Sequence, residues 1–139
     1  MAVQNQYLLV HCNQYALLID TQLILQVLSL DAAAAARVMI EWRERQLPLV
    51  DLNHIFLGGK VQSGRDCLIL DIKGDQSKFI AVSVGEVSNI EAISEEMFDD
   101  IPSLAFPYND YFDKVYIRPQ TQQCIYRLKP SVLLQHVNE

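Results

Sequence analysis

The sequence predicts a mainly β domain made of small barrels with a few short helices, and three observations favour this fold class. Half of the 139 residues are apolar, which is enough for a packed core. The apolar residues fall in many short runs, with turn residues between them roughly every eight to twelve positions. No fixed repeat and no linker divides the chain, so residues 1–139 are expected to form a single domain.

The first half of the chain predicts strands joined by short helical segments. YLLVHC and YALLI form a hairpin pattern, and Asp20 with Thr21 suits the start of a helical turn. The apolar stretch 23–30 is compatible with either a helix or a strand. Asp31 and the five alanines that follow predict a short helix. Strands are expected at 7–12, 15–19, 39–45 and 46–52, with helical segments at 20–21, 31–37 and 53–57. Pro48 implies an edge strand or a strand start, because proline cannot donate to a ladder.

The second half predicts a further series of short strands. In the first pair, every second residue is apolar at 68, 70 and 72 and again at 80, 82 and 84, which is the period of a strand. Ser94 and the two glutamates after it are typical of a capped helical turn. Strands are expected at 67–72, 79–84, 87–93, 111–117 and 124–128, a loop at 99–110 and a final helix at 132–137.

Charge and hydropathy exclude several classes of protein. The net charge of −6 disfavours general binding to nucleic acid phosphates, and no basic patch with interleaved aromatic residues is present. No apolar run is long enough to span a membrane, so membrane insertion is not expected. Residues 1–6 lack the layout of a signal peptide, and a cytoplasmic protein is therefore expected.

The motifs of common enzymes are missing, and we expect neither an active site nor a cofactor. Gly58-Gly59-Lys60 lacks the upstream glycine of a phosphate-binding loop, and a plain turn is the simpler interpretation. The three cysteines are expected to be small buried thiols: Cys12, Cys67 and Cys124. The histidines His11, His54 and His136 are scattered. A metal site that combines His11, Cys12 and a distant histidine stays open as an alternative.

An acidic segment runs from Glu86 to Asp113, with eight acidic residues and no lysine or arginine. A cation site would need oxygen atoms that converge, whereas these residues are dispersed over a strand, a turn and a loop. A solvated face is the simpler interpretation, and an acidic docking surface for a basic partner is the alternative. Tyr108, Tyr111 and Phe112 lie beside these acids and could form either an exposed aromatic lid or the cover of a barrel.

The segment Glu41–Phe56, EWRERQLPLVDLNHIF, resembles the signature of the CheW-like family. Leu47–Leu52 match the family pattern of a proline followed by an aliphatic residue, Val, Asp and Leu, and Arg43 stands where the family has an arginine before a tight turn. The order of strands is similar over residues 7–135. The resemblance implies two small five-stranded β-barrel subdomains and a non-enzymatic adaptor without a cofactor. It implies as partners a chemoreceptor signalling tip and the regulatory domain of a CheA-type histidine kinase.

The resemblance also implies where proteins would bind. The candidate residues are Arg43, Trp42, Glu44, Ile24, Leu25 and Val27. Trp42 and Arg43 are consecutive, so on a strand one would be buried and the other exposed, with Arg43 as the receptor-side contact. A solvated charge is the alternative for Arg43. Ile24, Leu25 and Val27 correspond to the strand with which the family contacts the kinase, and core burial is their alternative.

The chain departs from the family before its motif. An alanine-rich segment replaces a proline-containing loop, two glycines are missing, and a glutamate replaces an asparagine. These changes affect the turn of the hairpin and indicate a divergent member. A scaffold adapted to another protein partner through residues 32–44 is therefore a second hypothesis, and a barrel that binds a small molecule or a metal through its thiols is a third. Asp51 is expected to accept hydrogen bonds from the backbone of residue 53 or 54.

Overall fold

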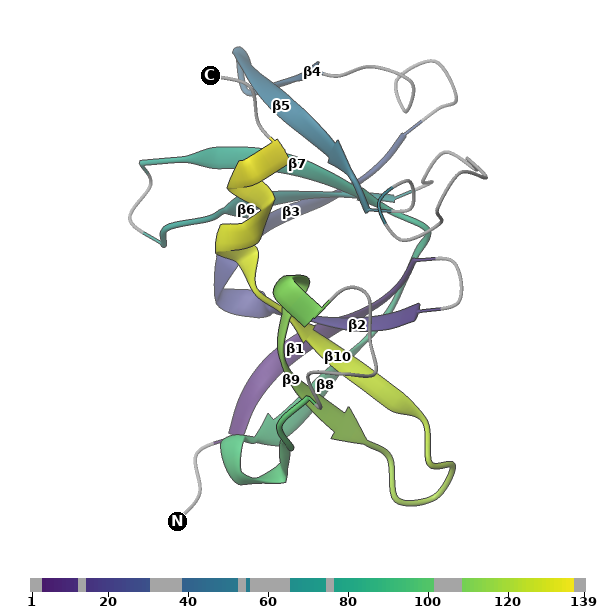
Figure 1. Ribbon diagram of the computed structural model, residues 1–139. Coiled ribbons are helices and arrows are strands. Elements are labelled where there is room, and N and C mark those ends of the chain that lie inside the picture. Colours follow the sequence, from purple (N-terminus) through teal and green to yellow (C-terminus); the bar gives the residue numbers. More distant parts are fainter. Residues whose placement is uncertain are drawn as a thin grey trace.

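The computed structural model describes residues 4–12, 15–30, 39–52, 55, 66–74, 77–101 and 109–136, and this part of the chain contains two five-stranded sheets (Figure 1). Sheet A has the order β8 (Glu86–Ser94), β1 (Gln4–Cys12), β2 (Tyr15–Asp20), β10 (Cys124–Leu128) and β9 (Phe112–Ile117). Sheet B has the order β3 (Ile24–Ser29), β6 (Asp66–Asp71), β7 (Phe79–Val84), β5 (Arg45–Asp51) and β4 (Met39–Trp42). The 3-10 helices are η1 (Thr21–Leu23), η2 (Glu95–Met97), η3 (Asn109–Tyr111) and η4 (Pro130–His136). The prediction of a mainly β fold with two five-stranded units is confirmed.

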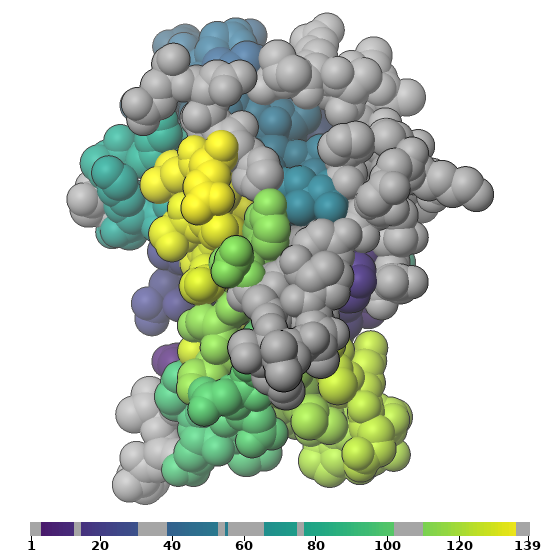
Figure 2. Space-filling view, viewed as in Figure 1, coloured from purple at the N-terminus to yellow at the C-terminus, as the bar shows by residue number. Residues whose placement is uncertain are grey.

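Sheet A is made from two separate parts of the chain, whereas sheet B comes from the part between them. Most neighbouring strands are antiparallel, but β10 pairs with β2 in parallel and β5 pairs with β7 in parallel. Figure 1 shows sheet B above sheet A in that view, with the chain crossing between them through η1, at the start of β8 and at η4. Figure 2 shows η4 at the surface beside the hairpin of β6 and β7.

The edges of the two sheets are joined by different contacts. In sheet A, Asp99 follows the edge strand β8 and forms a bridge with Val115 of the other edge strand, β9, through two backbone hydrogen bonds of 2.8 and 3.0 Å. Sheet B is a half-barrel, and its edge strands β3 and β4 are joined by a side-chain bond. The indole Nε1 of Trp42 donates to Oε1 of Gln26 across 2.8 Å.

Both faces of the central strands are buried, because each sheet has an interior of its own and also packs against the other sheet. In β1, Leu8 and Val10 face the core shared by the two sheets, whereas Tyr7 and Leu9 face the interior of sheet A. The alternating residues at 68, 70 and 72 and at 80, 82 and 84 all lie in the shared core, which confirms the period-two prediction. Residues 67, 69 and 81 face the interior of sheet B.

The predicted elements agree with the structure in most of the described residues. The ambiguous stretch 23–30 is mainly the strand β3, and the helical turn after residue 20 is η1, where Asp20 accepts a hydrogen bond from the backbone N–H of Gln22. The predicted turn after Ser94 is η2, although the Ser94 side chain forms no capping bond. The predicted turn at 13–14, the alanine helix at 31–37, the turn at 58–60 and almost all of the helical turn at 53–57 lie outside the described residues.

The prediction that Pro48 marks an edge strand or a strand start is wrong, because β5 is an inner strand. Pro48 is the last residue of β5 that pairs with β4, opposite Met39, and the parallel ladder to β7 begins one residue later at Leu49. The proline therefore lies where the strand changes partners. Its missing N–H costs little at this position, because neither ladder continues through it.

Candidate protein-binding surface

The candidate surface is centred on the turn between β4 and β5. Trp42 and Arg45 are the last pair of the hairpin, so Arg43 and Glu44 form a two-residue turn. Their φ angles are +48° and +64°, the positive pair that a type I′ turn requires. The prediction of a strand through residue 45 was therefore wrong. Neither turn residue is the glycine or asparagine that normally gives the signal for this turn, so the sequence pattern did not reveal it.

Trp42 belongs to the interior of sheet B, with 7% of its surface exposed. Its ring meets the ring of Phe79 edge to face, with 6.0 Å between the centroids. Its indole N–H is satisfied by Gln26, as a buried indole requires. The expectation that one of Trp42 and Arg43 is buried and the other exposed is confirmed, but the reason is the turn and not the alternation of a strand.

Two exposed arginines lie against this aromatic pair. The guanidinium carbon of Arg43 is 4.4 Å from the centroid of the Trp42 ring, and that of Arg45 is 4.7 Å from the centroid of the Phe79 ring. Stacking of this kind holds a guanidinium group in place without removing its charge. Sequence reasoning singled out Arg43 and missed Arg45, because the position of Phe79 beside β5 follows from a parallel pairing of distant segments.

The apolar residues of β3 are divided between core and solvent. Ile24 is half-buried against the shared core, whereas Leu25 is 42% exposed and Val27 is 45% exposed. Core burial is thus wrong for Leu25 and Val27. The pairing of β3 with β6 shifts between Ile24 and Gln26, so Leu25 lies in a β-bulge. Gln26, between the two exposed residues, carries the bond to Trp42, which places this strand beside the hairpin.

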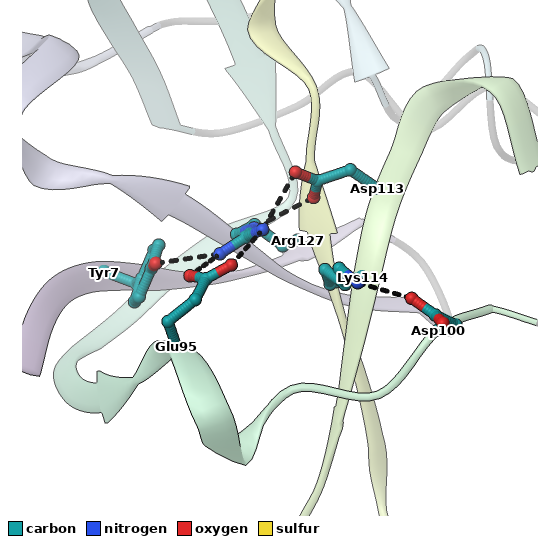
Figure 3. Close-up of polar contacts among 6 residues, drawn as sticks. All are labelled: Tyr7, Glu95, Asp100, Asp113, Lys114 and Arg127. Carbon is teal, nitrogen blue, oxygen red and sulfur yellow. Dashed lines mark hydrogen bonds and ion pairs between the residues drawn. The ribbon is translucent and has the colours of Figure 1, made fainter. Parts of the chain in front are cut away.

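Seven of the eight acidic residues of this segment are exposed, which agrees with the expectation of a solvated face, and several of their carboxylates also pair with cations of the same chain. Figure 3 shows Arg127 of β10 between two carboxylates. It donates to Glu95 across 2.7 and 3.1 Å and to Asp113 across 2.9 and 3.0 Å. Arg127 also donates to the hydroxyl of the buried Tyr7 at 3.2 Å, and its guanidinium carbon lies 4.5 Å from the centroid of the Phe98 ring.

Two further ion pairs connect the same segment to β9 and its end. Lys114 pairs with Asp100 (Figure 3), and Arg118 pairs with Glu91. Four of the eight acids therefore have intramolecular cationic partners. The hydrogen bond from Arg127 lowers the pKa of Glu95, and the hydrogen bond from Lys114 lowers the pKa of Asp100. These partners come 14 to 32 residues later in the chain, so the sequence alone did not indicate the pairing.

A groove of about 250 Å³ lies beside the Arg127 network. It is lined by strands of sheet A together with η1, η2 and the start of η4. The lining residues are Asn5, Tyr7, Asp20, Leu23, Glu95, Asp113, Arg127, Leu128 and Pro130. The hydrogen bonds of Arg127 go to Glu95, Asp113 and Tyr7, so its charge stabilises sheet A.

The environments of the cysteines are those of thiols packed in a core rather than of reactive or metal-binding thiols. Cys12 and Cys67 are fully buried, and burial raises the pKa of Cys12 to about 12 and that of Cys67 to about 11. Cys124 is exposed, so the expectation that all three thiols are buried is wrong for this residue. Within the described residues, no group of three or more metal-binding side chains comes together.

The aromatic residues beside the acidic segment were expected to form either an exposed lid or the cover of a barrel. Phe112 is buried in the shared core, and Tyr111 packs against it, so these residues cover the core and do not form an exposed lid. Tyr108 and the residues proposed to bond Asp51 lie outside the described part. None of the helices in the described part is both long and apolar enough to cross a membrane.

Comparisons with known proteins agree on the fold. The family model of the CheW-like domain matches residues 6–138. Among solved structures, the chain is similar to the scaffolding protein TtCheW from Thermoanaerobacter tengcongensis, with a TM-score of 0.71 and 15% sequence identity, over 91% of this chain and 90% of that chain. A comparison with curated proteins gave no match. Because the family model covers nearly the whole sequence, the chain belongs to the CheW-like domain family.

Proposed function

We propose that this chain is a non-enzymatic adaptor that couples chemoreceptor signalling tips to the regulatory domain of a CheA-type histidine kinase, in chemotaxis or pilus motility. The observation that carries the proposal is the exposed apolar pair Leu25 and Val27 on β3. Exposed apolar side chains beside polar neighbours are typical of protein-binding surfaces. The family and the fold of a scaffolding protein support the same reading. Such an adaptor would act in the cytoplasm.

The turn between β4 and β5 supplies the proposed receptor-side contact. Arg43 is exposed and held against Trp42, so little side-chain freedom remains to be lost when a partner binds. Trp42 is buried, and its role is to support Arg43 rather than to touch the partner. Glu44 is exposed in the same turn and would lie at the edge of the contact.

The kinase-side contact is tested by titrating the purified chain with the regulatory domain of the kinase encoded in the same genome. Leu25→Asp or Val27→Asp is expected to weaken the affinity about tenfold or more, as at an apolar interface. Ile117→Asp is the matched control, because Ile117 is 39% exposed and lies on β9 of the other sheet. A loss of affinity in the Ile117 variant that equals the loss in the β3 variants would contradict the assignment to β3.

The receptor-side contact is tested with a soluble fragment of the signalling tip of a receptor from the same genome. Arg43→Glu is expected to weaken that complex and to leave the kinase complex unchanged. A chain that binds neither partner in its unmutated form would refute the proposed function.

The second hypothesis, a scaffold adapted to another partner, has a specific basis in the non-glycine turn at residues 43 and 44. It predicts a chain that captures a different protein through residues 32–44 and ignores receptor and kinase fragments. The metal-binding barrel is less well supported, because Cys12 and Cys67 are buried with raised pKa values. The metal-binding hypothesis would be supported if the purified chain retained a stoichiometric amount of metal and the Cys12→Ser variant did not.

A further inference from the structure

The four arginines in the described part of the chain have two kinds of environment. Arg118 and Arg127 are paired with carboxylates. Arg43 and Arg45 instead lie on aromatic rings, and no carboxylate of the described residues is within ion-pair distance of either one. In a protein with a net charge of −6, two neighbouring cations without an acidic partner stand out.

The two guanidinium groups share one support. Arg43 lies on Trp42 and Arg45 lies on Phe79, and these two rings contact each other edge to face at 6.0 Å. The support is rigid, because Trp42 is buried and hydrogen-bonded to Gln26 of β3. The backbone adds to this order, since Trp42 and Arg45 are the closing pair of the hairpin.

A guanidinium group that stacks on a ring can still bind a carboxylate. An aromatic face attracts a guanidinium group but accepts none of its N–H bonds in the plane, so the fork of donors stays available. A planar guanidinium fork matches a carboxylate in a bidentate pair. Since both side chains are already held on rings, a partner carboxylate orders less flexible chain than it would at a free arginine.

We propose that Arg43 and Arg45 form a two-arginine site for an acidic segment of a protein partner, supported by Trp42 and Phe79. The proposal rests on the proposed function for the receptor-side role of Arg43, and it adds Arg45, Phe79 and the acidic chemistry of the partner. Glu44 lies between the two arginines in sequence and opposes such a partner, so it lowers the affinity of the site.

The site is tested without any receptor by titrating the ¹⁵N-labelled chain with an octaglutamate peptide at low salt. The Nε–H signals of Arg43 and Arg45 are expected to shift, and octalysine is expected to leave them in place. Arg45→Gln should weaken octaglutamate binding about fivefold, as the loss of one exposed charge pair does. Lys129→Gln removes the same charge from a half-buried lysine that follows β10 of the other sheet, and it should change the affinity less than twofold. Equal losses in the Arg45 and Lys129 variants would overturn the site.

The aromatic support is tested separately with Phe79→Leu, which keeps every charge and the apolar contact with the interior of sheet B. Octaglutamate affinity is expected to fall about threefold, with a folded spectrum. Unchanged affinity in this variant would contradict the role of the ring. Glu44→Gln is expected to raise the affinity, and a decrease would count against an acidic partner.

The same variants in the receptor-tip titration separate this proposal from the proposed function. If octaglutamate binds at the two arginines while the receptor tip does not bind, the site stands and the adaptor function fails. If the receptor tip binds with an affinity that Arg45→Gln does not change, the adaptor function stands and the two-arginine site is refuted.

Discussion

Replacing Arg127 by alanine tests the charge network that joins β10 to β1, β9 and η2. The guanidinium group donates to the buried Tyr7 hydroxyl, which contributes about 1 kcal/mol to the free energy of unfolding. The pairs with Glu95 and Asp113 are partly exposed, so each contributes only about 0.5 kcal/mol. The stacking on Phe98 adds about 0.5 kcal/mol. Together these contacts predict a loss of roughly 2–3 kcal/mol in Arg127→Ala.

Thermal unfolding followed by circular dichroism provides the assay. For a chain of 139 residues, the predicted loss lowers the melting temperature by about 8 °C. Arg118→Ala is the matched control, because it removes one arginine and its single ion pair with Glu91. We expect the control to lower the melting temperature by about 2 °C. A decrease in Arg127→Ala that is no larger than in the control would refute the reasoning that the network stabilises the sheet.

The remaining predictions concern pH, the hairpin turn and the thiols. The hydrogen bond from Arg127 lowers the pKa of Glu95 in the folded state, so the contribution of this pair to stability is present above about pH 4 and is lost as the pH falls below that. The free energy of unfolding of the native chain should therefore fall as the pH is lowered through this range. The free energy of unfolding of Arg127→Ala should depend less on pH over the same range. Glu44 has a positive φ, which costs a residue with a side chain about 1–2 kcal/mol. Glu44→Gly removes this cost, and after the greater flexibility of glycine in the unfolded chain is subtracted, the free energy of unfolding should rise by about 1 kcal/mol. Glu44→Ala should give no such increase, and equal urea midpoints for the two variants would contradict this. In the native chain at pH 8, a thiol reagent should modify Cys124 rapidly and leave Cys12 and Cys67 unmodified until denaturant is added, and rapid modification of all three would show that the buried pair is accessible.

The strands were predictable from sequence because their apolar runs are short and bounded by turn residues. The partners of the strands were not, since β2 pairs with β10 and β5 with β7 across long separations in the chain. Local patterns carry no information about such contacts, whose formation depends on the packing of the whole molecule.

The candidate surface was predicted only in outline. Arg43 was identified by resemblance, but its turn was misplaced because a positive φ without glycine leaves no mark in the sequence. The exposure of Leu25 and Val27 could not be read from their apolar character, since an apolar residue on an edge strand looks the same whether it faces core or solvent. Arg45 became part of the surface only when the position of Phe79 was known.

The division of sheet A between two parts of the chain has a consequence for how the molecule assembles during synthesis. All strands of sheet B are contained within residues 24–84 and are available together, whereas the hairpin of β1 and β2 leaves the ribosome long before β8, β9 and β10. Until then the apolar faces of that hairpin have only the strands of sheet B as neighbours from the shared core. The order of translation therefore favours docking of the first hairpin onto sheet B, with the later strands completing the other barrel around it.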